Sequence, residues 1–182
     1  NAYITYALSV AGLREEIENE FQKAYQEVLG AKDPYRMALV ALTASNLNKL
    51  EQLENLKLQL KELLPLVVEG KKELVEGSIT NSDGRSLRNE TLAWIALVFQ
   101  LDKKPSNELT LCMEALVKFA DKGYYGSTQA TGLALKAATG YYQLFDQDMK
   151  TKKGKKIELW VDGEILLRDT RPQADSLSKL FS

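Results

Sequence analysis

The side chains that could do chemistry are few, and the clearest group follows an aromatic pair between two glycines. In the segment Gly123-Tyr-Tyr-Gly-Ser-Thr-Gln-Ala-Thr131, the hydroxyls of Ser127 and Thr128 stand where a helix would begin. A hydroxyl in that place accepts a hydrogen bond from a free backbone N–H of the first turn. A serine nucleophile would need a neighbouring base, and the chain contains no histidine. We therefore expect Ser127-Thr128-Gln129 to cap a helix rather than to form a catalytic or binding site.

Two acidic candidates have equally plain explanations. Glu90 enters an apolar stretch without a partner carboxylate or a histidine in view, so we expect a satisfied polar contact rather than a general acid. The run Asn81-Ser-Asp before Gly84 suggests a calcium loop. Its ligand spacing is incomplete, however, and turn chemistry accounts for the same residues.

The single cysteine, Cys112, lies on an apolar stripe and reads as a small buried hydrophobe. One cysteine permits no internal disulfide. The sequence thus predicts no catalytic residue, no cofactor-binding residue and no metal ligand, and we expect the chain not to be an enzyme.

Charge excludes some classes of partner. The chain has 24 basic and 25 acidic residues and a net charge of −1, which does not favour nucleic acid. No segment is apolar for long enough to predict a membrane span. The basic run from Lys150 to Lys156 predicts a solvated linker, with a membrane surface or an anionic partner as the alternative.

Two kinds of helix alternate along the chain to position these side chains. Residues 3–11, 35–44, 87–101 and the stretch after Ser127 are apolar on nearly every side, which predicts burial on every side. Residues 14–29, 50–64 and 106–121 each carry one apolar stripe. Asp33-Pro34 predicts a helix start, and Pro65 predicts the end of a helix whose stripe comprises Leu50, Leu53, Leu56, Leu60 and Leu63.

This alternation predicts helical hairpins standing side by side in a curved double layer. Both a closed α/α toroid of inner and outer helices and an open solenoid fit it. Residues 66–85 predict a long loop, and helical patterning stops after Asp146. The runs 157–161 and 164–168 around Asp162-Gly163 predict a β-hairpin. We therefore expect a mainly helical domain over residues 3–146, followed over 147–182 by a linker and the first strands of an incomplete β-domain.

The glycine-aromatic segment 123–131, followed by Leu-Ala-Leu-Lys-Ala137, resembles a segment near the end of the thioester domain in the α-macroglobulin and complement family. The run Ile79-Thr-Asn-Ser-Asp-Gly-Arg-Ser-Leu-Arg-Asn-Glu-Thr-Leu-Ala93 is similar to the run before the penultimate inner helix of bacterial members. Residues 157–168 resemble the strands by which that family's chain returns to a β-sandwich. The resemblance covers most of the chain in the right order and implies the later part of an α/α toroid.

The family's reactive bond joins a cysteine to a glutamine three positions later, in a Cys-Gly-Glu-Gln type motif. Here Cys112 is followed by Met113, Glu114 and Ala115, so this chain cannot form that bond. The resemblance implies a structural piece of an extracytoplasmic protein, periplasmic or on the cell surface, that traps proteases or supports surface defence. Its partners would be neighbouring β-domains of the same protein and, through that protein, target proteases.

Two other classes of protein remain open. A helical-repeat binding scaffold would share the alternation but should present a polar, aromatic-rich concave face and lack the strands. An α/α-toroid enzyme of the terpenoid cyclase or polysaccharide lyase type would need an Asp-rich motif or a Tyr/His base in its central cavity. The sequence contains no histidine and no Asp-rich cluster.

Overall fold

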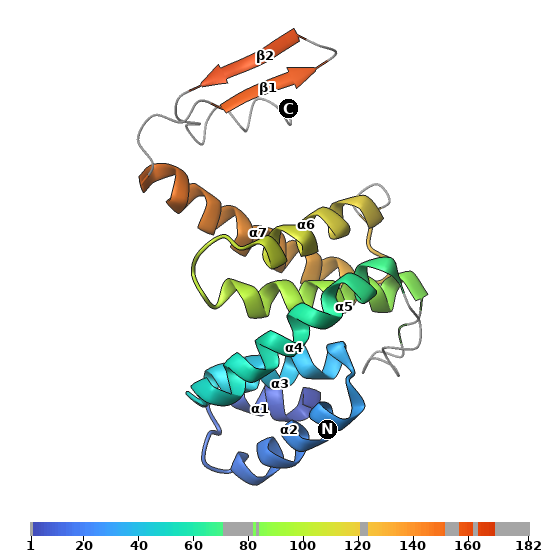
Figure 1. The fold of residues 1–182 in the computed structure, drawn as a ribbon, viewed down its shortest axis with the longest axis vertical. Coiled ribbons are helices and arrows are strands. Elements are labelled where there is room, and N and C mark those ends of the chain that lie inside the picture. Colours follow the sequence, from blue (N-terminus) through green and yellow to red (C-terminus); the bar gives the residue numbers. More distant parts are fainter. Residues whose placement is uncertain are drawn as a thin grey trace. The chain divides into compact units, whose positions relative to one another are not determined.

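The computed structural model describes residues 2–70, 82, 84–120, 124–151, 157–161 and 164–169, with side chains as far as residue 146. The chain divides into two compact units, Asn1–Leu144 and Phe145–Ser182. It is mainly helical. In order, the first unit holds α1 (Ala2–Val10), α2 (Glu18–Ala31), α3 (Pro34–Asn46), α4 (Leu50–Glu69), α5 (Gly84–Gln100), α6 (Asn107–Phe119) and most of α7 (Thr128–Thr151), as Figure 1 shows. In the second unit, β1 (Ile157–Val161) pairs antiparallel with β2 (Glu164–Asp169).

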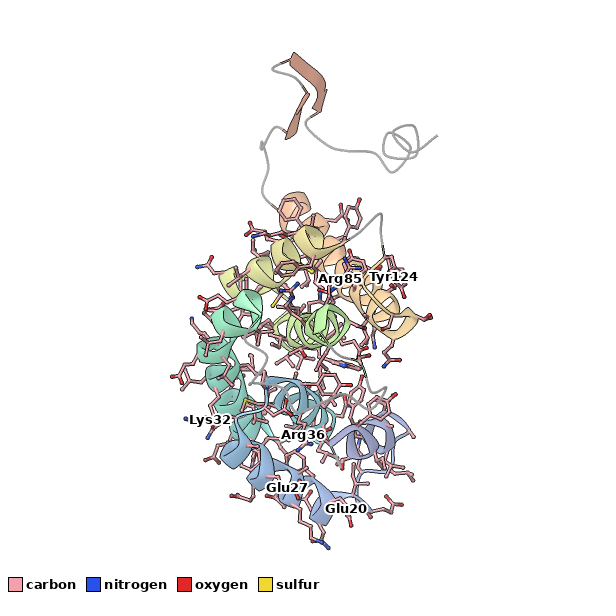
Figure 2. All side chains as sticks on the ribbon, turned by 90° about the vertical axis from the view of Figure 1, so that its right-hand side faces the viewer. Glu20, Glu27, Lys32, Arg36, Arg85 and Tyr124 are labelled. Carbon is pink, nitrogen blue, oxygen red and sulfur yellow. The ribbon has the colours of Figure 1, made fainter. Side chains whose placement is uncertain are left out.

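Two helices bury one face each, as the sequence predicts. In α2 the apolar positions Phe21, Ala24 and Val28 are buried, and Glu20 and Glu27 lie on its outer side (Figure 2). In α6 the buried side chains are Leu109, Cys112, Ala115 and Leu116. The Ser106 hydroxyl caps α6 by accepting a hydrogen bond of 3.1 Å from the N–H of Leu109.

The helix α4 is also one-sided, but its end and part of its stripe differ from the prediction. The prediction that the helix ends at Pro65 is wrong, because α4 continues to Glu69 and closes at Gly70 in the left-handed conformation. Pro65 lies on the exposed side, while Leu64 and Val67 beside it are buried. Burial of these two side chains offsets the cost of a proline inside a helix. Leu50, expected on the stripe, is 68% exposed.

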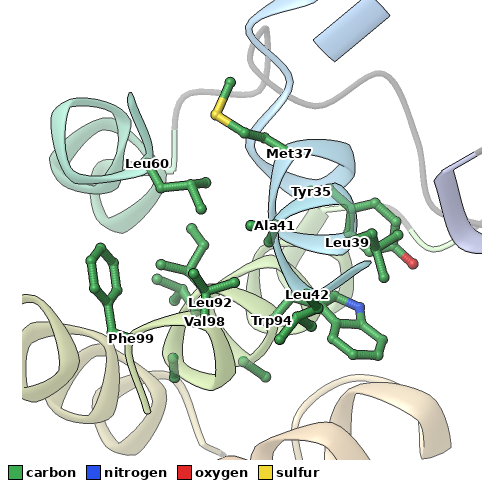
Figure 3. Packing of buried hydrophobic residues seen from close by; sticks show 14 of the residues in the cluster. Tyr35, Met37, Leu39, Ala41, Leu42, Leu60, Leu92, Trp94, Val98 and Phe99 are labelled. Atoms are coloured by element: carbon green, nitrogen blue, oxygen red, sulfur yellow. The ribbon is translucent and has the colours of Figure 1, made fainter. Parts of the chain in front are cut away.

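The helices α3 and α5 form the centre of the first unit and pack against each other. Asp33 caps α3, since its Oδ1 atom accepts hydrogen bonds from the N–H groups of Tyr35 (2.9 Å) and Arg36 (3.3 Å). Both helices are buried on nearly every side, as predicted. Their apolar side chains interlock with those of α4 (Figure 3), and the labelled residues of this core are Tyr35, Met37, Leu39, Ala41, Leu42, Leu60, Leu92, Trp94, Val98 and Phe99.

The helix α1 buries small polar residues and exposes some of its apolar ones. The prediction of burial on every side is wrong, because Ile4 and Val10 are 51% and 62% exposed while Thr5 and Ser9 are buried. Ser9 Oγ accepts a hydrogen bond of 2.9 Å from Asn46 Nδ2 at the end of α3. The ring of Tyr6 packs edge-to-face on the ring of Trp94 of α5, with 5.3 Å between the two ring centroids. Small polar residues and one aromatic contact therefore attach α1 to the central helices.

The helix α7 is one-sided, so the prediction that it is buried all round is wrong as well. Its small residues Ala130, Ala134 and Ala137 are buried, whereas Leu135 and Tyr142 are 59% and 53% exposed. It also continues past Asp146 to Thr151, beyond the point where the sequence predicts that helical patterning stops. Gln100, the last residue of α5, donates a hydrogen bond of 2.6 Å to the carbonyl oxygen of Ala137 on this helix.

Ion pairs tie α4 to its neighbours. Lys61 Nζ lies 2.6 Å from Glu108 of α6. The largely buried Lys57 ammonium pairs with Asp102, which follows α5, and lies 3.0 Å from Glu54 on its own helix. These pairs join the α3–α4 hairpin to the α5–α6 hairpin at the outer edge of the core.

Candidate functional site

Polar side chains meet where α5 and α7 begin, and we call this group the polar junction. Its members come from the first half of α5, from a position two residues before that helix, from the residue before α7, and from the first turn of α7. They are Ser82, Ser86, Asn89, Glu90, Ser127 and Thr131.

Glu90 is the acidic centre of the polar junction. Its side chain has no solvent exposure. Its Oε1 atom accepts hydrogen bonds from Ser82 Oγ at 2.6 Å and from Ser127 Oγ at 3.2 Å. The prediction of a satisfied polar contact at Glu90 is confirmed.

Ser127 is engaged on both sides of its hydroxyl. Besides donating to Glu90, its Oγ atom accepts a hydrogen bond of 2.9 Å from the N–H of Ala130 in the first turn of α7. The predicted helix cap is therefore confirmed at Ser127. Thr128, the first residue of α7, is exposed, and Gln129 is half-buried.

The backbone of the glycine-aromatic segment is held by two further hydrogen bonds. Asn89, also fully buried, donates from Nδ2 to the carbonyl oxygen of Tyr125 at 2.9 Å. The N–H of Tyr125 donates to Thr131 Oγ1 at 3.2 Å. Among the described residues, Asn89 Oδ1 has no hydrogen-bond partner.

Gly126 lets this segment cross α5 at close range. Its φ of +104° is one that side-chain-bearing residues rarely adopt, and a Cβ atom there would lie 3.0 Å from the Cα atom of Ser86. Ser86 is a short residue on α5. Conformation and space thus both require glycine at position 126.

The polar junction places a carboxylate beside a serine, the arrangement of a base and a nucleophile. Here, however, Glu90 is sealed from solvent, and the Ser127 oxygen already accepts from the start of α7. A base and its nucleophile must both be accessible to the substrate, and the carboxylate of Glu90 is not exposed. The hydrogen bonds of this pair instead connect the first half of α5 to the start of α7.

The thiol of Cys112 is fully buried in the core beside α5. Burial, and then the charge of Glu108, raise the pKa of Cys112 far above its ordinary value. Because the thiolate is the reactive form, this thiol is not set up as a nucleophile. The prediction of a small buried hydrophobe at this position is confirmed.

Several candidates lie outside what the structure describes. These are Asn81 and Asp83 of the suggested calcium loop and the lysines at 152, 153, 155 and 156, together with the side chain of Lys150. Within the described ranges, no three acidic, cysteine or histidine side chains are grouped to hold a metal ion. The helices of those ranges include none with the length and apolar character to traverse a bilayer.

Sequence reasoning missed Asn89 and Ser86. Asn89 stands next to Glu90 shortly before the apolar run 92–99, and that pair of polar residues at the edge of a buried segment was a usable signal. Two adjacent polar side chains deep in a buried helix need partners from elsewhere in the chain. The contact of Ser86 with Gly126 depends on tertiary packing and has no sequence signal.

Comparisons with known protein families, with curated proteins and with solved structures find no match.

Proposed function

We propose that this chain is a non-enzymatic structural part of a bacterial α-macroglobulin-like protein. It would form the later part of a thioester-type helical domain, an α/α toroid in which α3 and α5 are inner helices. The β1–β2 pair would begin the adjoining β-domain. The whole protein would act outside the cytoplasm, either by trapping proteases or in surface defence.

The observation that carries this proposal is a contact between the two segments that resemble the family. One segment contains Ser86 and Glu90, and the other contains Gly126 and Ser127. Ser127 Oγ lies 3.2 Å from Glu90, and Gly126 leaves room for Ser86. Two segments that resemble one domain of one family are expected to meet in space if the resemblance is real.

The helix packing supports the same proposal. The buried helices α3 and α5 are adjacent, and each is followed in the chain by a one-sided helix that packs on it, α4 and α6 respectively. Repetition of a buried helix and a covering helix is what an inner and an outer ring require. A structural rather than catalytic role is supported by the sealed Glu90 and by the buried Cys112 thiol.

A protease-trapping assay with the intact protein tests the proposal. A protease incubated with the intact protein should comigrate with it on a native gel. The trapped protease should still cleave a small chromogenic peptide while losing most of its activity on a large protein substrate. Undiminished cleavage of the large substrate, with the protease migrating alone, would remove protease trapping from the proposal.

A second arm addresses the reactive bond, which would lie outside this chain. Methylamine should inactivate a parent protein that carries an upstream Cys-Gly-Glu-Gln motif, because the amine opens the activated acyl group. A parent without that motif should trap proteases equally well with and without methylamine. Either result is compatible with a structural role for this chain. The response to methylamine distinguishes a parent protein that has the upstream motif from one that lacks it.

A further inference from the structure

We draw no further inference here: the strongest candidate, the uncharged outer face of α1 on which Ile4, Ala7 and Val10 are exposed, carries no proposal because nothing in the described part of the chain shows what covers it.

Discussion

The hydroxyl of Ser127 lies 3.2 Å from the carboxylate of Glu90, a residue 37 positions earlier in the chain. The same hydroxyl accepts a hydrogen bond from the N–H of Ala130. One oxygen atom therefore begins α7 and fastens it to the buried part of α5. A cap that also makes a tertiary contact should contribute more to stability than a cap alone.

Ser127→Ala should lower the free energy of unfolding by about 2–3 kcal/mol, because it removes a helix cap and a buried hydrogen bond together. Ser106→Ala is the matched control. Ser106 caps α6 in the same way, and its loss should cost about 1 kcal/mol. Urea unfolding of both variants measures the difference. Equal losses would mean that the contact with Glu90 contributes nothing.

Gly126→Ala should destabilise the chain more than Gly12→Ala does. Both glycines have positive φ, +104° and +88°, but a Cβ atom at Gly12 would meet nothing within 4 Å. Gly12→Ala should therefore show only the cost of the left-handed backbone, about 1–2 kcal/mol. Gly126→Ala adds the displacement of Ser86 backbone atoms, about 1 kcal/mol or more. Thermal or urea unfolding separates the two, and a smaller loss for Gly126→Ala would contradict the close crossing.

Alanine should stabilise the chain at Gly132 of α7 and leave the stability about unchanged at Gly140. At exposed Gly132 a Cβ atom would meet nothing within 4 Å, so Gly132→Ala should stabilise by about 0.5–1 kcal/mol through helix propensity. At Gly140 it would meet the side-chain amide of Gln100, which donates to the carbonyl oxygen of Ala137 at 2.6 Å. Losing that bond costs about 1 kcal/mol and cancels the gain. Equal stabilisation by both substitutions would show that Gln100 moves aside freely.

Acid should destabilise the chain through two carboxylates that pair with lysines. Hydrogen bonds, first from Lys49 and then from Gln22, lower the pKa of Glu18 below 4.5, and a hydrogen bond from Lys61 does the same for the pKa of Glu108. A lowered pKa means that the unfolded chain binds more protons near pH 4. The stabilisation is therefore present above about pH 4.5 and is lost as the pH falls through the folded-state values.

Urea unfolding from about pH 6 to pH 3 measures this loss. Lys61→Met should make the acid-induced decrease shallower, because Glu108 then loses its partner. Lys23→Met, at an exposed lysine of α2, should leave the slope unchanged. The effect at Glu18 should be smaller than its geometry suggests, since its side chain is 42% exposed and screened by water. A slope identical in all three proteins would rule out the Lys61–Glu108 contribution.

The parts of the fold that depend on local chemistry follow from the sequence. Asp33 and Pro34 start α3 because the acid accepts backbone hydrogen bonds and the proline needs none. Ser127 starts α7 for the same reason. The all-round burial of the apolar runs 37–42 in α3 and 92–99 in α5 follows from their composition, since every residue in these two runs is apolar. In each of these cases the residues of a single segment are enough to explain the structure of that segment.

The parts that the sequence misjudges depend on neighbours. Pro65 ends a helix in isolation, but burial of Leu64 and Val67 carries α4 past it. Composition made α1 and α7 look buried on every side, while the structure covers one side of each. Which side is covered depends on the helices beside it, and hydrophobic content alone does not reveal that. The partner of Asn89, the carbonyl of Tyr125, is likewise fixed only by packing.

The contact between α3 and α5 has a consequence for the order of folding. The pairs α3–α4 and α5–α6 are neighbours in the chain and pack on each other, so each hairpin can close early over a short loop. The contact between α3 and α5 can form only after the chain has folded back over α4 and the residues that follow it, which separate the two helices in sequence. A ribosome that has released only α1 to α4 therefore presents an unfinished core, in which the side of α3 that packs on α5 lacks its partner. Chaperone binding to that nascent chain should end when α5 emerges.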